Sequence, residues 1–188
     1  PPPPLASRAK SEARNRLEAF SQSLACSYLA GEVAYVACAV RMAADLSEVD
    51  TESLTLSLVD DAFFVLLKAF SRGVTTGHAL LAVIPLLHAI VSSLRTLCLP
   101  LLQKRLRFAG SAEAGNSAFV VAVNSMQCAD EYTAKLKQHV ASSFSSSEHL
   151  HGSIGMAEVA LAELDELAAE CREAAQAAIR RLAAELLP

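Results

Sequence analysis

The chain of 188 residues contains no tryptophan, and aromatic residues make up only 5% of it. Glycine and proline occur seven times each, and four of the prolines form the run at positions 1–4. Helix-breaking residues are therefore scarce, and no alternating strand pattern competes with helical spacing. Because alanine and leucine supply much of the 53% hydrophobic content, the composition predicts an all-α domain of helices packed on helices.

The cysteines are odd in number and widely spaced, and no CxxC pair occurs, so neither a disulfide framework nor a structural zinc site is predicted. We expect reduced, mostly buried thiols in a cytosolic protein. The net charge of −4 is spread over mixed signs without a basic stripe, so nucleic acid is not an expected partner. The mean hydropathy of +0.33 is high, which suggests that something outside this chain covers some of its faces.

Five helical stretches are predicted, at about 11–46, 52–72, 78–107, 118–144 and 156–187. They suggest an elongated antiparallel helix bundle or stacked helical rod, as in multisubunit tethering complexes. Residues 1–10 are predicted to be a Pro-rich disordered lead, and 11–187 a helical-bundle segment of a longer protein. Pro85 and Pro100 are expected to kink the third helix.

Two apolar rows follow the first predicted helix in steps of three and four, which predicts packing against more than one neighbour. One row consists of Leu17, Phe20, Leu24, Tyr28, Gly31, Tyr35, Cys38 and Met42, and the other of Leu29, Val33, Val36 and Val40.

The adjacent carboxylates Asp60 and Asp61 lie inside an apolar helical run, so their side chains point about 100° apart. We interpret them as a solvated helix edge, with Asp60 capping the helix or bridging to a neighbour. His88 is expected to be a hydrogen-bonded core histidine, and the pair His149 and His151 lacks further metal ligands. The sequence has no Gly-rich phosphate loop, nucleophile elbow or HExxH motif, so no enzyme, metal site or cofactor is predicted.

The apolar stretch Ala79–Leu102 approaches the length of a membrane span. It contains two prolines and Arg95, and a charge inside a span is costly. A buried bundle helix is the favoured interpretation, and a membrane-embedded helical protein is an alternative.

Three stretches resemble one protein family. SLVDDAFFVLLKAFSR, residues 57–72, resembles the Val-Asp-Asp-x-Phe-aromatic-Val/Ile motif of subunit 4 of the conserved oligomeric Golgi complex. FVVAVNSMQCADEYTAKLKQHV, residues 119–140, is similar to a second stretch of that family, although Ser125 and Gln127 depart from its pattern. The run from Tyr28 to Glu32 resembles a Tyr-Phe-x-x-Glu element that precedes them. The resemblance extends over about residues 28–144, with gaps.

The resemblance implies a non-catalytic scaffold segment of a Golgi vesicle-tethering subunit, acting in intra-Golgi retrograde transport. Such a protein is cytosolic and peripheral on the Golgi membrane, and it requires no cofactor. Its implied partners are the other tethering subunits, SNAREs, Sec1/Munc18-type proteins and Rab GTPases. The residues expected to form a structural or interface signature are Val59, Asp60, Asp61, Phe63, Phe64, Asn124, Cys128, Tyr132 and Leu136.

Two alternatives remain besides the membrane protein. One is a subunit of another helical-rod tether, exocyst-like or endosome-to-Golgi. The other is an unrecognised enzyme that holds Asp60 or His88 in a pocket.

Overall fold

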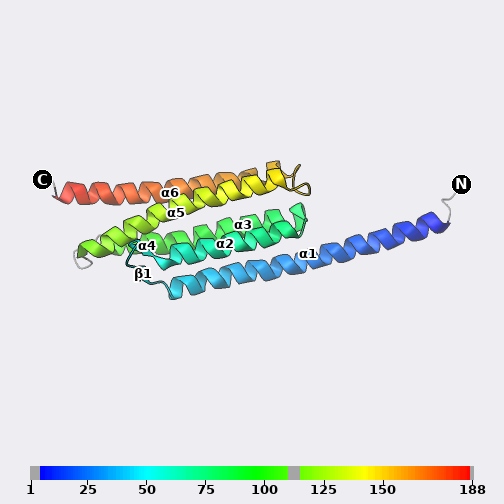
Figure 1. Ribbon diagram of the computed structural model, residues 1–188, viewed down its shortest axis with the longest axis horizontal. Helices are drawn as coiled ribbons and strands as arrows, with labels where there is room; N and C mark the ends of the chain where they lie inside the picture. Colours follow the sequence, from blue (N-terminus) through cyan, green and yellow to red (C-terminus); the bar gives the residue numbers. More distant parts are fainter. Residues whose placement is uncertain (1–4, 110–114, 187–188) are drawn as a thin grey trace.

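The computed structural model describes residues 5–109 and 115–186. The protein is an all-α bundle of long antiparallel helices that run back and forth along one axis (Figure 1). Helix α1 (Leu5–Asp45) packs on α2 (Ser57–Thr75) and α3 (Ile84–Ser93). Helix α5 (Gly115–Ser146) contacts α2, α4 (Leu99–Ala109) and above all α6 (Ile154–Leu186). The pair α2 and α3 therefore lies between α1 and the α5–α6 hairpin.

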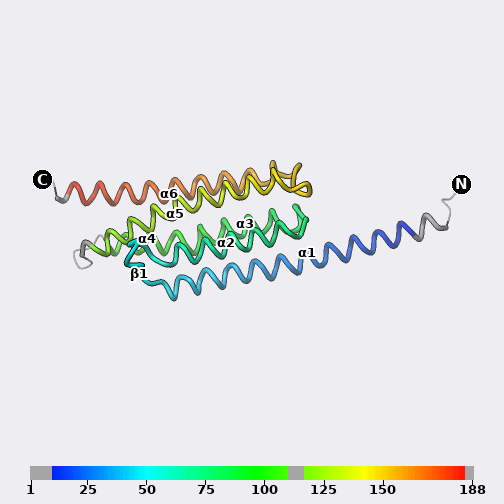
Figure 2. The backbone as a smooth tube through the Cα atoms, viewed as in Figure 1, coloured from blue at the N-terminus to red at the C-terminus, as the bar shows by residue number. Residues whose placement is uncertain are grey.

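The first helix begins at Leu5, earlier than the predicted start at residue 11, so the predicted disordered lead is helical from residue 5 onward. Residues 1–4 of that lead lie outside the described residues. The N-terminal part of α1 extends past the end of the bundle, as the blue segment of the tube shows (Figure 2). Every side chain from Lys10 to Phe20 is exposed there.

A small hairpin replaces the predicted start of the second helix. Strand β1 (Val49–Asp50) pairs antiparallel with β2 (Thr55–Leu56), and α2 begins only at Ser57. The Asp50 carboxylate accepts hydrogen bonds from the Glu52 N–H (2.8 Å) and the Ser53 hydroxyl (2.9 Å), which stabilises the turn. The all-α prediction is confirmed, with these four residues forming the strands of the hairpin. The second helix ends at Thr75 rather than at residue 72, just before Gly77, whose φ is +68°.

The two prolines of the third helix are accommodated by wide turns. The π-helical turns η1 (Ala79–Val83) and η2 (Leu94–Cys98) each end just before the α-helix that carries a proline at its second position, Pro85 in α3 and Pro100 in α4. A proline ring clashes with the carbonyl four residues earlier and supplies no N–H, so widening the preceding turn relieves the clash. The helix from Ala79 to Ala109 stays continuous through both prolines.

The last two helices agree with their predicted positions to within three residues at each described end. In the connection between them, residues 147–153, Leu150 is fully buried. Ion pairs join α5 to α6, with Lys137 at 2.6 Å from Asp165 and Arg172 at 2.8 Å from Asp130.

Only one of the two apolar rows on α1 packs against the bundle. Val36 and Val40 are fully buried, and Leu29 packs against them. The other row, which was also expected to be covered, is exposed from Leu17 to Met42 apart from the half-buried Tyr28. The row that faces the bundle includes Ala25 and Ala43, small residues that let the helices approach closely.

Two described helices, Lys10–Asp45 and Ala79–Ala109, are long and apolar enough to cross a membrane. Half of the apolar window of the second is buried inside the bundle, as in the core helix of a soluble protein. Only 22% of the apolar window of the first is buried, because most side chains of its second apolar row are exposed.

Candidate functional site

Residues of the two longest family-like stretches meet where α2 crosses α5. The Tyr132 hydroxyl of α5 donates a hydrogen bond of 2.5 Å to the Asp60 carboxylate of α2. The Tyr132 ring packs edge-to-face on Phe63, with 5.6 Å between ring centroids. Asp60 therefore bridges to a neighbouring helix, which is one of the two roles expected for it.

In this contact the Tyr132 side chain is a protonated phenol. The hydrogen bond to the Asp60 carboxylate raises the pKa of Tyr132 well above its usual range, and burial adds to the effect. Burial also raises the pKa of the Cys128 thiol beside it. Tyr132 therefore keeps its proton at neutral pH and acts as a hydrogen-bond donor rather than as a base.

A shallow surface groove of roughly 430 Å³ runs along this crossing. Asp61 and Phe64 line its outer edge, where Phe64 is 62% exposed and the Lys68 ammonium lies 5.5 Å from its ring centroid. Asp61 is exposed and makes no hydrogen bond or ion pair within the described residues. The groove therefore presents one carboxylate already bonded to a phenol and another in open solvent, and the Lys135 ammonium lies over the phenol ring, 4.8 Å from its centroid.

The remaining predicted site residues are structural. Val59 and Leu136 belong to the hydrophobic core. Asn124 is half-buried, and its side chain makes no hydrogen bond in the part of the chain that the structure describes. Its neighbour Ser125, noted only as a departure from the family pattern, is fully buried and joins two elements. Its hydroxyl accepts a bond of 2.9 Å from the Leu56 N–H and donates one of 2.7 Å to the Val121 carbonyl. The sequence feature that could have identified Ser125 is a serine inside an apolar helix, because a buried hydroxyl needs a hydrogen-bond partner.

The third family-like stretch forms a second polar contact, between α1 and α2. Glu32 accepts two hydrogen bonds from the Arg72 guanidinium, at 2.7 and 2.8 Å. The Arg72 bonds hold the pKa of Glu32 below its usual range, against the effect of burial. Burial, helped by the Glu32 charge, raises the pKa of Tyr28 to about 12. The Arg72 guanidinium also stacks 5.1 Å from the Tyr35 ring centroid.

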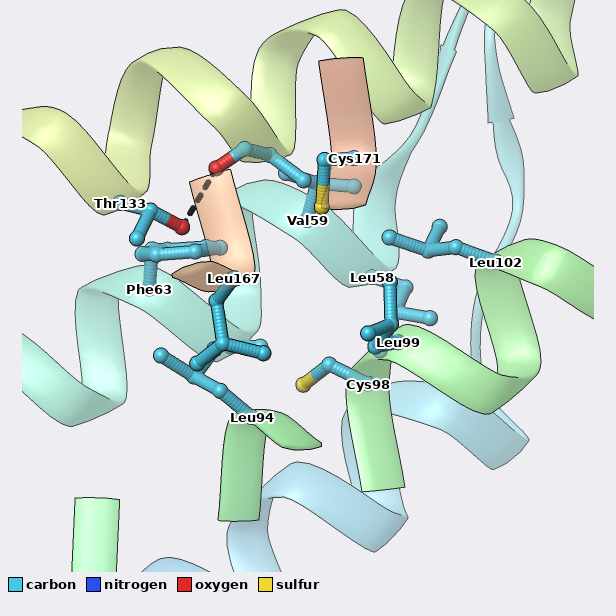
Figure 3. Close-up of a pocket in the computed structure, with 12 residues that line it drawn as sticks. Leu58, Val59, Phe63, Leu94, Cys98, Leu99, Leu102, Thr133, Leu167 and Cys171 are labelled. Atoms are coloured by element: carbon cyan, nitrogen blue, oxygen red, sulfur yellow. Dashed lines mark hydrogen bonds between the residues drawn. The ribbon is translucent and has the colours of Figure 1, made fainter. Parts of the chain in front are cut away.

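An interior cavity lies where α2, α5, α6 and the helix Ala79–Ala109 meet (Figure 3). Its volume of about 20 Å³ holds no more than a water-sized probe, and apolar side chains form almost all of its wall. Cys98 and Cys171 border it, and burial raises the pKa of each thiol to about 12. The cavity is a packing defect of the core rather than a ligand site.

All five cysteines are free. Cys26 and Cys38 are exposed and Cys128 is half-buried, so the expectation of mostly buried thiols was wrong for the cysteines of α1. These two cysteines are exposed because they lie on sides of α1 that no other helix covers.

The histidines do not form a metal site. Among the described residues, no group of three or more His, Cys, Asp or Glu side chains is placed to hold an ion. His88 is exposed, so the prediction of a core histidine was wrong, because η1 and α3 turn it to the outside of the bundle. His78 instead joins two elements through a bond of 2.9 Å between its ring nitrogen and the Ser21 hydroxyl.

Comparison with known proteins leaves the site without a relative. No protein-family model, no curated protein and no solved structure matches the chain.

Proposed function

We propose that this chain is a non-catalytic scaffold segment of a Golgi vesicle-tethering subunit that acts in intra-Golgi retrograde transport on the cytosolic face of the membrane. In this proposal its partners are the other subunits of the conserved oligomeric Golgi complex. SNAREs, Sec1/Munc18-type proteins and Rab GTPases bind the assembled complex through the full-length protein.

The observation that carries the proposal is the pairing of the polar residues that the family-like stretches supply. Glu32 of the stretch 28–32 bonds Arg72 of the stretch 57–72, and Asp60 of that stretch bonds Tyr132 of the stretch 119–140. The paired residues are 40 and 72 positions apart in the chain, and each pair joins two helices. Residues that form such pairs are required for one particular arrangement of the helices. A resemblance that extends over three helices should preserve this arrangement.

The shape and chemistry of the bundle support the non-catalytic part of the proposal. The groove beside Asp60 is shallow, and the phenol that bonds Asp60 holds its proton. An elongated bundle with an uncovered apolar helix face suits a protein that works by binding other helices.

The test is affinity purification of the full-length parent protein from cells, followed by mass spectrometry. We expect the other subunits of the Golgi tether to co-purify in comparable amounts. A parent protein that carries Asp60→Asn and Tyr132→Phe tests the interface, and one that carries Asp61→Asn is the matched control. Recovery with exocyst or endosome-to-Golgi subunits would favour the alternative tether, and recovery with an enzyme complex or alone would overturn the proposal.

A further inference from the structure

The exposed apolar row of α1 is the largest uncovered feature of the described chain. Its long side chains are 49–72% exposed, namely Leu17, Phe20, Leu24, Tyr35, Met42 and Leu46, with Cys38 among them. We call this row the α1 stripe. Together with the half-buried Tyr28 and with Gly31, these residues follow steps of three and four, which keeps them on one side of a straight helix from Leu17 to the end of α1.

The N-terminal half of the stripe has almost no support from the bundle. Leu17 and Phe20 lie in the run Lys10–Phe20, in which every side chain is exposed. An isolated helix of this length is only marginally stable in water, and packing of an apolar face supplies most of the stability of helices in proteins. A partner that covers this half must also be a long apolar surface.

We propose that the partner is a second copy of this chain, with the two α1 helices packed antiparallel and a two-fold axis near Gly31. Two pairs of stripe residues are symmetric about this glycine. Reversing the helix about Gly31 places Phe20 opposite Met42 and Leu24 opposite Cys38. The unsupported half of each α1 then lies on the bundle-supported half of the other.

The side chains near the axis fit this register. A helix knob enters a hole formed by four residues of the facing helix. Tyr35 of one copy lies opposite a hole formed by Leu24, Ser27, Tyr28 and Gly31 of the other copy. Two of these four residues, Ser27 and Gly31, are small. A Cβ added at Gly31 meets no atom within 4 Å in the single chain, so the space above this residue is open.

Charges beside the stripe favour the antiparallel orientation. Arg16 and Asp45 are both exposed, and neither has an ion-pair partner within the described residues. At about 100° per residue they lie on the same edge of α1, only about 20° apart around the helix. The two-fold axis therefore brings Arg16 of each copy beside Asp45 of the other, forming two equivalent ion pairs. A parallel pair would form neither ion pair, because Arg16 of one copy would then lie about 43 Å along the helix axis from Asp45 of the other.

The area is adequate for a specific dimer. Six long side chains at these exposures contribute on the order of 700 Å² on each copy, close to the ~800 Å² per partner of a standard interface. The stripe is also continuous, which favours a dry interface core.

The first test is the mass of the 188-residue chain by light scattering during size-exclusion chromatography over a range of micromolar concentrations. We expect a dimer, and we expect Leu24→Glu to give a folded monomer, since Leu24 is exposed in the single chain. Arg16→Glu or Asp45→Arg alone should weaken the dimer about tenfold, and the double variant should recover it because the ion pair is reversed.

Disulfide cross-linking tests the register, in chains that carry Cys26→Ser. Leu24→Cys should form a disulfide with native Cys38 of the other copy under mild oxidation, and adding Cys38→Ser should abolish it. Without Leu24→Cys, no cross-link should form, because the two Cys38 residues lie about 21 Å apart along the helix axes. A disulfide between the two Cys38 residues would indicate a parallel dimer and overturn the proposal.

Other occupants of the stripe give different results. A chain that is monomeric at every concentration refutes the dimer. If that monomer floats with lipid vesicles and Leu24→Glu prevents it, the stripe binds membrane. If the monomer binds another tethering subunit and Leu24→Glu prevents this binding, the α1 stripe is the binding surface for that subunit.

Discussion

Replacing Arg72 with methionine should cost much more stability than replacing its partner Glu32. The Glu32 side chain is only 10% exposed, whereas that of Arg72 is 44% exposed. Arg72→Met removes two charge-assisted bonds and leaves a nearly buried carboxylate unpaired, at a cost of about 2–4 kcal/mol. Glu32→Met leaves a guanidinium that water still reaches and that remains stacked on Tyr35, at a cost of about 1 kcal/mol.

The difference should depend on pH. In the native chain the pKa of Glu32 lies below its unfolded value of 4.5, so the pair stabilises fully above that value and weakens as the pH falls through the lower folded pKa. Without Arg72, burial raises the pKa of Glu32 instead, so protonation near pH 4 relieves the unpaired charge. The loss caused by Arg72→Met should therefore be large at pH 7 and clearly smaller at pH 4.

Urea unfolding followed by circular dichroism measures both effects. The double variant should lose little more than Glu32→Met alone, because the unpaired carboxylate is then absent. The matched control is Arg41→Met, an exposed arginine on α1, the helix that carries Glu32, which should change the unfolding free energy by no more than about 0.5 kcal/mol. Equal losses for the two single variants, or a loss for Arg72→Met that is the same at both pH values, would refute the reasoning.

Three further predictions concern the other interfaces. Tyr132→Phe should lower the unfolding free energy by about 1 kcal/mol through loss of its carboxylate bond, while Asp61→Asn should leave it unchanged in the same urea titration; equal effects would contradict the assignment. Ser125→Ala should cost about 1–3 kcal/mol, because it leaves a backbone N–H without its acceptor, and a thermal melt that matches the native chain would contradict this. In a thiol-reagent assay at mildly alkaline pH, the two exposed cysteines should react at once, whereas Cys98 and Cys171, with pKa values raised to about 12 by burial, should react only on unfolding.

The helices could be predicted from the sequence because apolar spacing and the scarcity of glycine and proline act locally. The hairpin was missed because it depends on the side chain of Asp50 and on a backbone bond from Ser57 to Glu48, which no periodic pattern reveals. The π-helical turns were missed because a proline shows where the hydrogen bonding of a helix must change, but not whether the helix bends or forms a wider turn there.

The orientation of α1 could not be predicted, although both of its apolar rows were recognised. Periodicity identifies an apolar face, but neighbouring helices decide which face is covered. Here Arg72 of α2 fixes the choice by binding Glu32, which lies beside the row of Val36 and Val40. For the same reason, Asp60 could be placed at a helix edge from sequence, whereas its partner Tyr132 comes from a helix about seventy residues further along.

The two π-helical turns also determine where the helix from Ala79 to Ala109 tolerates a change in length. A π turn holds one residue more than the α turn that it replaces. Loss of one residue from Leu94–Cys98 would return this turn to α-helical bonding and leave Leu102 and Leu106 facing the core. Loss of one residue after Pro100 would instead rotate everything that follows by about 100° and turn this buried row toward water. Single-residue insertions and deletions in this helix should therefore be confined to the two turns that precede its prolines.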